Sequence, residues 1–334
     1  MALKNTKLGL LRGAKSITGT RSAPKSLKPQ QSRQIIRRFH VLQKNKSSII
    51  ARLNTLIVDH DINTTNYKEV FSNLPSYNSQ YNDSYLRYSQ ELKKSDKDVY
   101  RVDELDDDQL VDKLARIDAE IVLRGGIETY QSASTQGQDS NRGGDSSKRL
   151  MEWLKDERYA KLHNTNALEI GCLSAKNMIS TSKMFSNVVR IDLNSQSPLI
   201  LQQDFMKRPL PKNDNEKFNV ISCSLVINFV PSPKERGDML IRMTKFLKKP
   251  TSQCPSCLFF VLPLPCVANS RYFDRHLLDE IMKSLGFRET FYYEAKKVAY
   301  WLYDWDGIVN IKPFPKREIH SGATRNNFCI AISK

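Results

Sequence analysis

One glycine and one carboxylate, Gly171 and Asp192, are the residues whose types and spacing most clearly indicate a ligand site. Gly171 follows the short apolar run ALEI at residues 167–170, and Asp192 closes the run VVRID at residues 188–192. Such runs are typical of buried parallel strands, and glycine permits a tight turn that a ligand can approach closely. In open α/β sheets an acidic residue about 20 positions further on receives the hydroxyls of a ribose. We therefore expect a nucleoside cofactor here.

The residues around Gly171 favour one cofactor over another. Dinucleotide enzymes place a pyrophosphate on a G-x-G-x-x-G turn, whereas this loop offers Gly171 alone. The nearby carboxylate of Glu169 repels a pyrophosphate but attracts a ligand with a sulfonium and an ammonium group. S-adenosyl-L-methionine fits this charge pattern and NAD does not. An isolated E-x-G also fits an ordinary strand followed by a turn, so this alternative stays open at this point.

Two further strand-like runs supply candidate ligand contacts. Residues 199–204 end in Asp204, which we expect to accept a hydrogen bond from the adenine amino group, with Phe205 lying on the ring. Residues 218–224 form the next run, and its last residue, Ser224, is expected to face the reacting methyl group. Asp204 and Ser224 would then lie with Gly171 at the carboxyl ends of the strands.

The later segments continue the alternation of strands and helices. Residues 232–247 have helical periodicity, with Met239, Leu240, Met243 and Leu247 on one face, and residues 257–262 form a continuously apolar run. Strand, helix and strand in this order predict a doubly wound α/β fold with a parallel sheet.

At four places the sequence resembles a known family. These are residues 125–154, LEIGCLS at 168–174, RIDLNS at 190–195 and SLVINFVPSPKERGDML at 224–240. The chain is similar over about residues 120–334 to yeast-type nucleolar methyltransferases that modify adenine N1 in 25S ribosomal RNA. The resemblance implies an α/β, Rossmann-like class I methyltransferase sheet, S-adenosyl-L-methionine bound by Gly171 and Asp192, and a large-subunit ribosomal RNA or pre-ribosome as partner. It also implies a location in the nucleus and nucleolus.

The acceptor chemistry requires little from side chains. Adenine N1 carries a lone pair, so the protein must orient donor and acceptor and exclude water rather than supply a strong base. The run after residue 224 lacks the Asp/Asn-Pro-Pro-aromatic motif of amino-directed adenine methyltransferases. Asn228 and Phe229 are our candidates to position the base by a hydrogen bond and by stacking. Pro265-Cys266 lacks the surrounding motif of a cytosine-C5 nucleophile.

The positive charge of the chain is concentrated at its N-terminus. The chain has a net charge of +16, and residues 1–50 hold 12 Lys or Arg and no acidic residue. We predict a basic disordered arm at residues 1–34, a helical region at residues 35–130 and the methyltransferase domain at residues 131–334. The arm fits contact with RNA phosphates, nuclear targeting or a solvated tail, and these roles are compatible.

Several patterns predict the interior of the helical region. Residues 35–56 read as a long amphipathic helix, and a stripe of tyrosines shares one helical face at positions 77, 81, 85 and 88. We interpret this stripe as core packing, with base stacking as the alternative. Residues 103–123 read as an acidic helix whose carboxylates form a solvated face. Residues 131–147 read as a loop that ends in a helix cap.

Two Arg-Gly-Gly sequences, at residues 124–126 and 142–144, flank Tyr130 and Gln131. Arg124 is our candidate for the cofactor carboxylate, because methyltransferases often cover the methionine end with the segment before the first strand. We expect no membrane span, free buried thiols for the cysteines and no metal site. The oligomeric state stays open, with a monomer preferred.

Two classes of function remain. One is an RNA methyltransferase. The other is a non-catalytic S-adenosylmethionine sensor that acts through a protein partner. The resemblance implies this alternative too, because a related animal branch of the family acts as such a sensor for the TOR kinase complex. The basic arm favours the enzyme, because a sensor has no evident need for such a block of charge.

Overall fold

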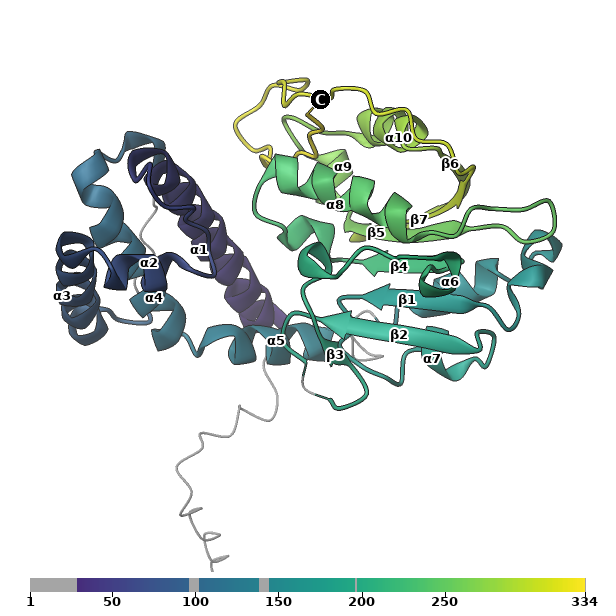
Figure 1. The fold of residues 1–334 in the computed structure, drawn as a ribbon, viewed down its shortest axis with the longest axis horizontal. Coiled ribbons are helices and arrows are strands. Elements are labelled where there is room, and N and C mark those ends of the chain that lie inside the picture. The colour runs from purple at the N-terminus through teal and green to yellow at the C-terminus, as the bar shows by residue number, and fades with distance from the viewer. Residues whose placement is uncertain (1–28, 96–101, 138–143, 196, 334) are drawn as a thin grey trace, which may run out of the picture.

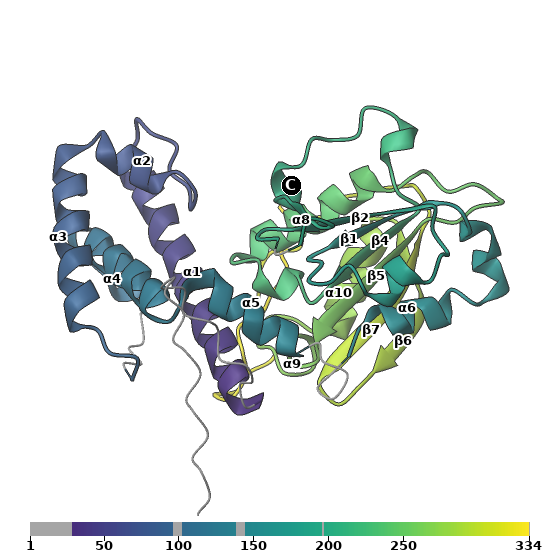
Figure 2. The ribbon, with the colours of Figure 1, turned by 90° about the horizontal axis from the view of Figure 1, so that it is seen from below.

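The computed structural model describes residues 29–95, 102–137, 144–195 and 197–333, so the predicted arm lies outside the described residues up to position 28. The described chain forms a helical N-terminal part and a larger part built on one sheet (Figure 1). Helix α5 (Gly126–Gly137) runs between the two parts in both views (Figures 1 and 2).

The larger part contains a seven-stranded sheet with the order β3-β2-β1-β4-β5-β7-β6. Strands β1 to β5 run parallel, and β7 is antiparallel to both of its neighbours. The strand order reverses between β1 and β4, which is where open α/β sheets bind ligands. The strands are β1 (Asn166–Ile170), β2 (Asn187–Asp192), β3 (Leu201–Gln202), β4 (Val220–Ser224), β5 (Cys257–Pro263), β6 (Phe287–Glu294) and β7 (Val298–Trp305).

The central strands are buried on both faces, as their continuous apolar sequences predict. Along β5, Leu258, Phe260 and Leu262 belong to the core on one face and Phe259 and Val261 to the core on the other. The first face is covered by α8 (Pro233–Phe246), α9 (Pro265–Ala268) and α10 (Arg275–Ser284), and the second by α6 (Ser147–Trp153) and α7 (Met178–Thr181). The predicted doubly wound fold is confirmed.

Helix α8 shows how the sequence sets its own boundaries. The Ser232 hydroxyl accepts from the Glu235 backbone N–H at 3.1 Å, and the Glu235 carboxylate accepts from the Ser232 N–H at 3.1 Å. This reciprocal pair satisfies two donors at the first turn. The predicted apolar face, with Met239, Leu240 and Met243, is buried against the sheet.

The third predicted strand is shorter than expected. Residues 199–204 form only the two-residue strand β3, because both of its residues are exposed at the edge of the sheet. Asp204 instead caps a short 3-10 turn, accepting from the Met206 backbone N–H at 2.8 Å.

The helical part consists of α1 (Pro29–Leu56), α2 (Tyr67–Ser72), α3 (Pro75–Glu91) and α4 (Leu110–Leu123), which pack on α5 through α1 and α4. Helix α1 begins at Pro29, inside the segment predicted as an arm to position 34. Proline suits the first helical turn because that turn needs no N–H from it. Helix α5 continues through residues 131–137, which were predicted as a loop, and it crosses the predicted domain boundary after residue 130.

The tyrosine stripe packs inside this helical part, which confirms the packing interpretation. Tyr81 and Tyr88 are buried, and Tyr77 and Tyr85 lie partly buried beside them. Their polar ends are also satisfied: the Tyr88 hydroxyl donates to Asp112 at 2.8 Å and the Tyr81 hydroxyl to Asp118 at 2.6 Å.

The prediction of a solvated acidic face was wrong for two carboxylates of α4. Asp118 is buried and receives hydrogen bonds from Lys46 at 2.6 Å and from the hydroxyls of Tyr67 and Tyr81. Glu120 is buried and pairs with arginines of α1 and α4. Apolar periodicity missed this because two of the three pairing cations, Lys46 and Arg38, come from another helix, α1, which covers this face.

All six cysteines carry free thiols, and five of them are buried. Within the described ranges, no cluster of three or more His, Cys, Asp or Glu side chains is arranged to hold a metal ion. A search of the same residues finds no helix long and apolar enough to cross a membrane.

Candidate cofactor site at the carboxyl edge of the sheet

The register of the parallel strands brings the predicted site residues to one edge. Ile170, at the end of β1, pairs with Ile191 of β2 on one side and with Cys223 of β4 on the other. Gly171, Asp192 and Ser224 each follow these partners directly, so they lie side by side at the carboxyl ends. In Figure 1 the arrowheads of β1, β2 and β4 point toward α1 and α5, so the helical part lies at this edge of the sheet.

Gly171 occupies a position that no other residue fits well. Its φ of +72° lies in the left-handed region, and a Cβ built there would meet Val226 Cγ2 at 2.4 Å. The Gly171 and Cys172 backbone N–H groups both donate to the Ile191 carbonyl, at 2.9 and 3.0 Å, which turns the chain sharply off β1. The backbone at this position therefore requires glycine, and the Val226 side chain packs against the turn.

Glu169 lies just below this turn and is incompletely hydrogen-bonded. The residue is 7% exposed, and its Oε1 accepts from Asn177 Nδ2 at 2.6 Å. Its buried Oε2 has no hydrogen-bond partner within the described part of the chain. Burial raises the pKa of this carboxyl above its ordinary value, against the effects of the bond from Asn177 and of a weaker one from the Cys172 thiol. A cationic group at this edge would stabilise the ionised form.

Asp192 and Asp204 lie at the ends of β2 and after β3. Asp192 is half-buried and its Oδ1 accepts from the Asn194 backbone N–H at 2.9 Å, which fixes the carboxylate where the strand ends. The Asp204 carboxylate is held by its cap to Met206. Phe205 points inward: it is 4% exposed, with its ring centroid 5.1 Å from that of Phe246. Stacking of Phe205 on a cofactor ring therefore remains a prediction that requires this ring to turn out of the core.

Arg124 ends α4 and is engaged by a carboxylate of its own helix. Its Nε donates to Glu120 Oε1 at 2.6 Å, and Arg38 of α1 holds both oxygens of Glu120 at 2.6 and 2.7 Å. Although burial opposes ionisation, the hydrogen bonds from the two arginines hold the pKa of Glu120 below its ordinary value. Contact between Arg124 and a cofactor carboxylate stays a prediction. In that contact the Arg124 guanidinium would bind both Glu120 and the carboxylate of the cofactor.

The segment after β4 is tied to the segment before β1. Ser224 Oγ lies 2.7 Å from Ser146 Oγ, just before helix α6. Asp145 accepts from the backbone N–H groups of Ser147, at 2.8 Å, and Met178, at 2.5 Å, and so joins the starts of α6 and α7. Leu225 then adopts a φ of +56°, which is unusual for a residue with a side chain and marks an abrupt turn off β4.

Asn228 and Phe229 lie in the 3-10 turn Ile227–Phe229 that follows this turn. Asn228 is half-buried, and its Oδ1 is closed to solvent without a hydrogen-bond partner among the residues described. The Phe229 ring meets Tyr130 of α5 at 5.8 Å between centroids and His40 of α1 at 4.2 Å.

Phe39, His40, Tyr130 and Phe229 form an aromatic cluster that the sequence did not reveal. Phe39 stacks on Tyr130, with centroids 4.6 Å apart and an interplanar angle of 14°. Phe39 and His40 lie 190 and 189 positions before Phe229, so no local spacing connects them. The only signal was that α1 carries adjacent aromatic residues within its apolar pattern.

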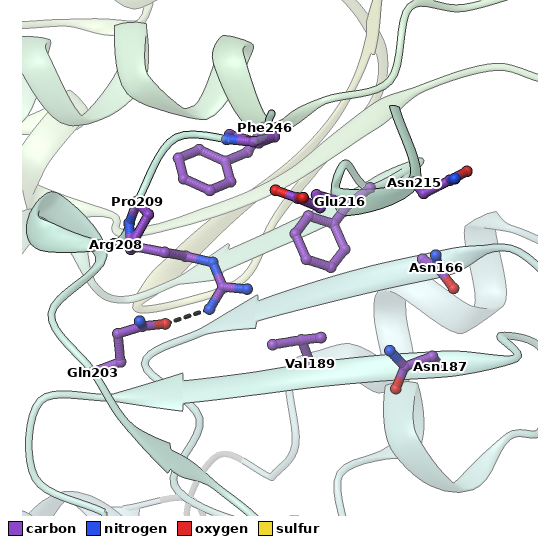
Figure 3. Close-up of a pocket in the computed structure, with 11 residues that line it drawn as sticks. Asn166, Asn187, Val189, Gln203, Arg208, Pro209, Asn215, Glu216 and Phe246 are labelled. Atoms are coloured by element: carbon purple, nitrogen blue, oxygen red, sulfur yellow. Dashed lines mark hydrogen bonds between the residues drawn. The ribbon is translucent and has the colours of Figure 1, made fainter. Parts of the chain in front are cut away.

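A pocket of about 390 Å³ lies along one face of β1 and β2, from their first residues to Gln203 (Figure 3). Its lining includes Asn166 and Asn187, the first residues of β1 and β2, and Arg208, which donates to Gln203. None of the predicted site residues lines it. The polar groups expected to bind a nucleoside therefore gather at the carboxyl edge and not in this pocket.

The strand order, the glycine turn and the carboxylate after β2 define a class I methyltransferase fold. The sequence model of the family "25S rRNA (adenine(2142)-N(1))-methyltransferase, Bmt2" matches residues 115–330. The chain belongs to this family.

Two relatives and two solved structures are similar to the chain. A 25S rRNA (adenine(2142)-N(1))-methyltransferase of Saccharomyces cerevisiae is 37% identical, over 96% of this chain and 99% of the relative. A 25S rRNA adenine-N(1) methyltransferase of Schizosaccharomyces pombe is 41% identical, over 66% of this chain and 82% of the relative. The N-methyltransferase NodS of Bradyrhizobium japonicum, in complex with S-adenosyl-l-homocysteine, has a TM-score of 0.36 at 13% identity and covers 52% of this chain and 97% of its own. The amino pentose methyltransferase CalS10 of Micromonospora echinaspora has the same TM-score and identity and covers 52% of this chain and 95% of its own.

Proposed function

We propose that this chain transfers a methyl group from S-adenosyl-L-methionine to N1 of an adenine in large-subunit ribosomal RNA. The observation that carries the proposal is the arrangement of Gly171, Glu169 and Asp192 at the carboxyl edge of a class I methyltransferase sheet, in a member of the adenine-N1 family. The non-catalytic sensor is less favoured, because both relatives that align with this chain are named as methyltransferases.

The residues at the edge fit the cofactor by charge and by space. Gly171 would let a ligand approach the backbone, and Asp192 would receive ribose hydroxyls. The unpartnered oxygen of Glu169 provides negative charge near the position of the ammonium and sulfonium groups. Asp204 would accept from the adenine amino group, Ser224 would border the reacting end, and Arg124 would contact the carboxylate.

S-adenosylmethionine, when bound, supplies a methyl group whose bonding electrons return to sulfur as adenine N1 takes the methyl carbon. The protein has no proton to remove, because N1 of neutral adenine already carries a lone pair. Asn228 and Phe229 would orient the base, with the amide oxygen of Asn228 as a hydrogen-bond acceptor and the ring of Phe229 as a stacking surface. Orientation and exclusion of water then account for the rate.

Three finer features belong to the same proposal. We infer that the basic N-terminal residues bind RNA or direct the chain to the nucleus and nucleolus, where ribosomes are assembled. The methyltransferase domain would begin near residue 131, with α5 joining it to the helical region. We also propose that the chain acts as a monomer.

The proposal is tested by incubating the purified chain with S-adenosylmethionine and unmodified large-subunit rRNA, then mapping methylation by primer extension. A methyl group on N1 blocks Watson–Crick pairing, so reverse transcriptase should stop at one adenine with the wild-type chain and at none with a Gly171→Arg variant. Cofactor binding without any stop, on naked rRNA and on pre-ribosomal particles, would instead support the sensor.

A further inference from the structure

The aromatic cluster brings a side chain of the helical part to the point where the acceptor base must bind. His40 contacts Phe229 at 4.2 Å between ring centroids, with an interplanar angle of 61°, and it contacts Tyr130 at 5.5 Å. All three rings are half-buried, so the cluster borders solvent rather than the interior of either part. The acceptor side of the site is therefore built from α1, α5 and the turn after β4 together.

Two polar atoms in this region are closed to solvent but unpaired. His40 Nε2 and Asn228 Oδ1 both lack a hydrogen-bond partner in the part of the chain that the structure describes. Unpaired buried polar atoms are rare, because each gives up its hydrogen bonds to water without replacement. A cluster that served packing alone would place a phenylalanine at position 40, since an imidazole adds an unsatisfied nitrogen and no apolar area.

We propose that His40 is a substrate-recognition residue, and that its Nε2 accepts a hydrogen bond from the exocyclic amino group of the target adenine. This inference rests on the proposed function and adds a residue from outside the sheet. A contact to the amino group reads the base as adenine while leaving N1 free to react. Asn228 Oδ1, one residue from Phe229, is the second acceptor available to the same amino group, which has two hydrogens.

The protonation state of His40 suits this role. Burial lowers the pKa of its imidazole to about 4, so the ring is neutral at pH 7 and one of its nitrogens is an acceptor. A neutral ring also avoids repulsion as positive charge passes to the adenine on methylation. The faces of Phe229 and Tyr130 attract such a cation.

The test combines a change in the protein with a change in the base. The RNA is a ligated rRNA fragment that carries either adenine or purine, which lacks the amino group, at the position that the wild-type chain methylates. Single-turnover rates are measured for the wild type, His40→Phe, His40→Gln and Val41→Ala. Val41 is the control because it is the next residue of α1 and is 44% exposed.

If His40 accepts a hydrogen bond from the amino group, the effects of the two changes on the methylation rate should not be additive. Replacing adenine by purine should slow the wild type by at least about tenfold, because the bond to His40 and the one to Asn228 are both lost. His40→Phe should slow methylation of adenine about tenfold but should differ little from the wild type on purine. His40→Gln should retain part of the discrimination because its amide oxygen still accepts, and Val41→Ala should match the wild type. Affinity for S-adenosylhomocysteine should stay within about twofold in all variants.

Equal slowing of His40→Phe on adenine and purine, or no slowing on adenine, would overturn the inference while leaving the proposed function intact. A wild-type chain that methylates no adenine at all would instead refute the proposed function, and this inference with it. A loss of cofactor affinity in His40→Phe would also count against it, since that result assigns His40 to the cofactor side.

Discussion

Buried carboxylates in the two parts of the molecule differ in how completely they are paired. In the helical part, Asp118 and Glu120 use both of their oxygens: Asp118 with Lys46 and two tyrosines, Glu120 with two arginines. At the sheet edge, Glu169 has one bonded oxygen and one without a partner in the described chain. The pKa of Glu120 is lowered and that of Glu169 is raised accordingly. Paired carboxylates hold helices together, whereas an incompletely paired one indicates a place for a ligand.

The largest expected effect comes from filling the turn at the sheet edge. Gly171→Arg should abolish binding of S-adenosylmethionine, because the first atom of the new side chain already meets Val226 and the rest must enter the cofactor space. Isothermal titration calorimetry checks this. The control is Gly307→Arg, which imposes a side chain on a similar φ of +81° far from the edge. Wild-type affinity in a folded Gly171→Arg variant would remove Gly171 from the site.

Removing the Glu120 carboxylate should lower the stability of the fold and leave the affinity for S-adenosylmethionine unchanged. Glu120→Ala leaves the guanidinium groups of Arg38 and Arg124 without their shared carboxylate, and we expect a loss of about 3–5 kcal/mol in the free energy of unfolding. Urea unfolding measures it, with Asp214→Ala, an exposed partner of Lys217, as a control that should change little.

The pH dependence of stability, measured with a second substitution at position 120, sharpens the comparison. Because the folded pKa of Glu120 is lowered, its contribution is present above the ordinary value of 4.5 and is lost as the pH falls through the folded pKa. The stability difference between wild type and Glu120→Gln should therefore shrink on acidification below that value. A difference that stays constant to low pH would show that the ion pairs add nothing to stability.

A moderate effect is expected from the carboxylate after β2. Asp192→Ala should weaken cofactor binding by about 1.5–3 kcal/mol, the range for hydrogen bonds to charged groups. S-adenosylhomocysteine should lose as much as S-adenosylmethionine, because both carry the ribose. Asp192→Asn, which keeps an oxygen acceptor, should lose less. A deficit confined to S-adenosylmethionine would place Asp192 near the sulfonium.

The smallest effect on cofactor binding should come from the basic N-terminus. Helix α1 begins at Pro29, so the chain should be shortened after Lys28, which removes seven of the Lys and Arg residues. If half of these contact RNA, the slope of log affinity against log salt should fall by about 2 to 3, at 0.7 to 0.9 per phosphate. Cofactor affinity should not change. An unchanged slope would leave targeting as the purpose of these residues.

The sequence predicted the sheet well because its signals are local. Short, mostly apolar runs mark β1, β4 and β5, and the left-handed turn at Gly171 needs glycine. It failed where a residue depends on a distant partner. Asp118 and Glu120 pair with Lys46 and Arg38 of α1, and His40 meets Phe229 only because α1 lies against the carboxyl edge. Arg124 and Phe205 were assigned by position alone, and the structure shows each of them with protein partners as well.

The most direct test of this account is the affinity of a Glu169→Gln variant for S-adenosylmethionine, measured by calorimetry beside Glu120→Gln. Removing the incompletely paired charge should weaken binding by about 1.5–3 kcal/mol. Because burial raises the pKa of Glu169, the free energy of unfolding of the wild-type chain falls as the pH rises through that pKa. At pH 7 the Glu169→Gln variant should therefore be at least as stable as the wild type. Glu120→Gln should show the reverse, with lower stability and unchanged affinity of the folded chain. Wild-type affinity in Glu169→Gln would contradict the placement of the cofactor at this edge.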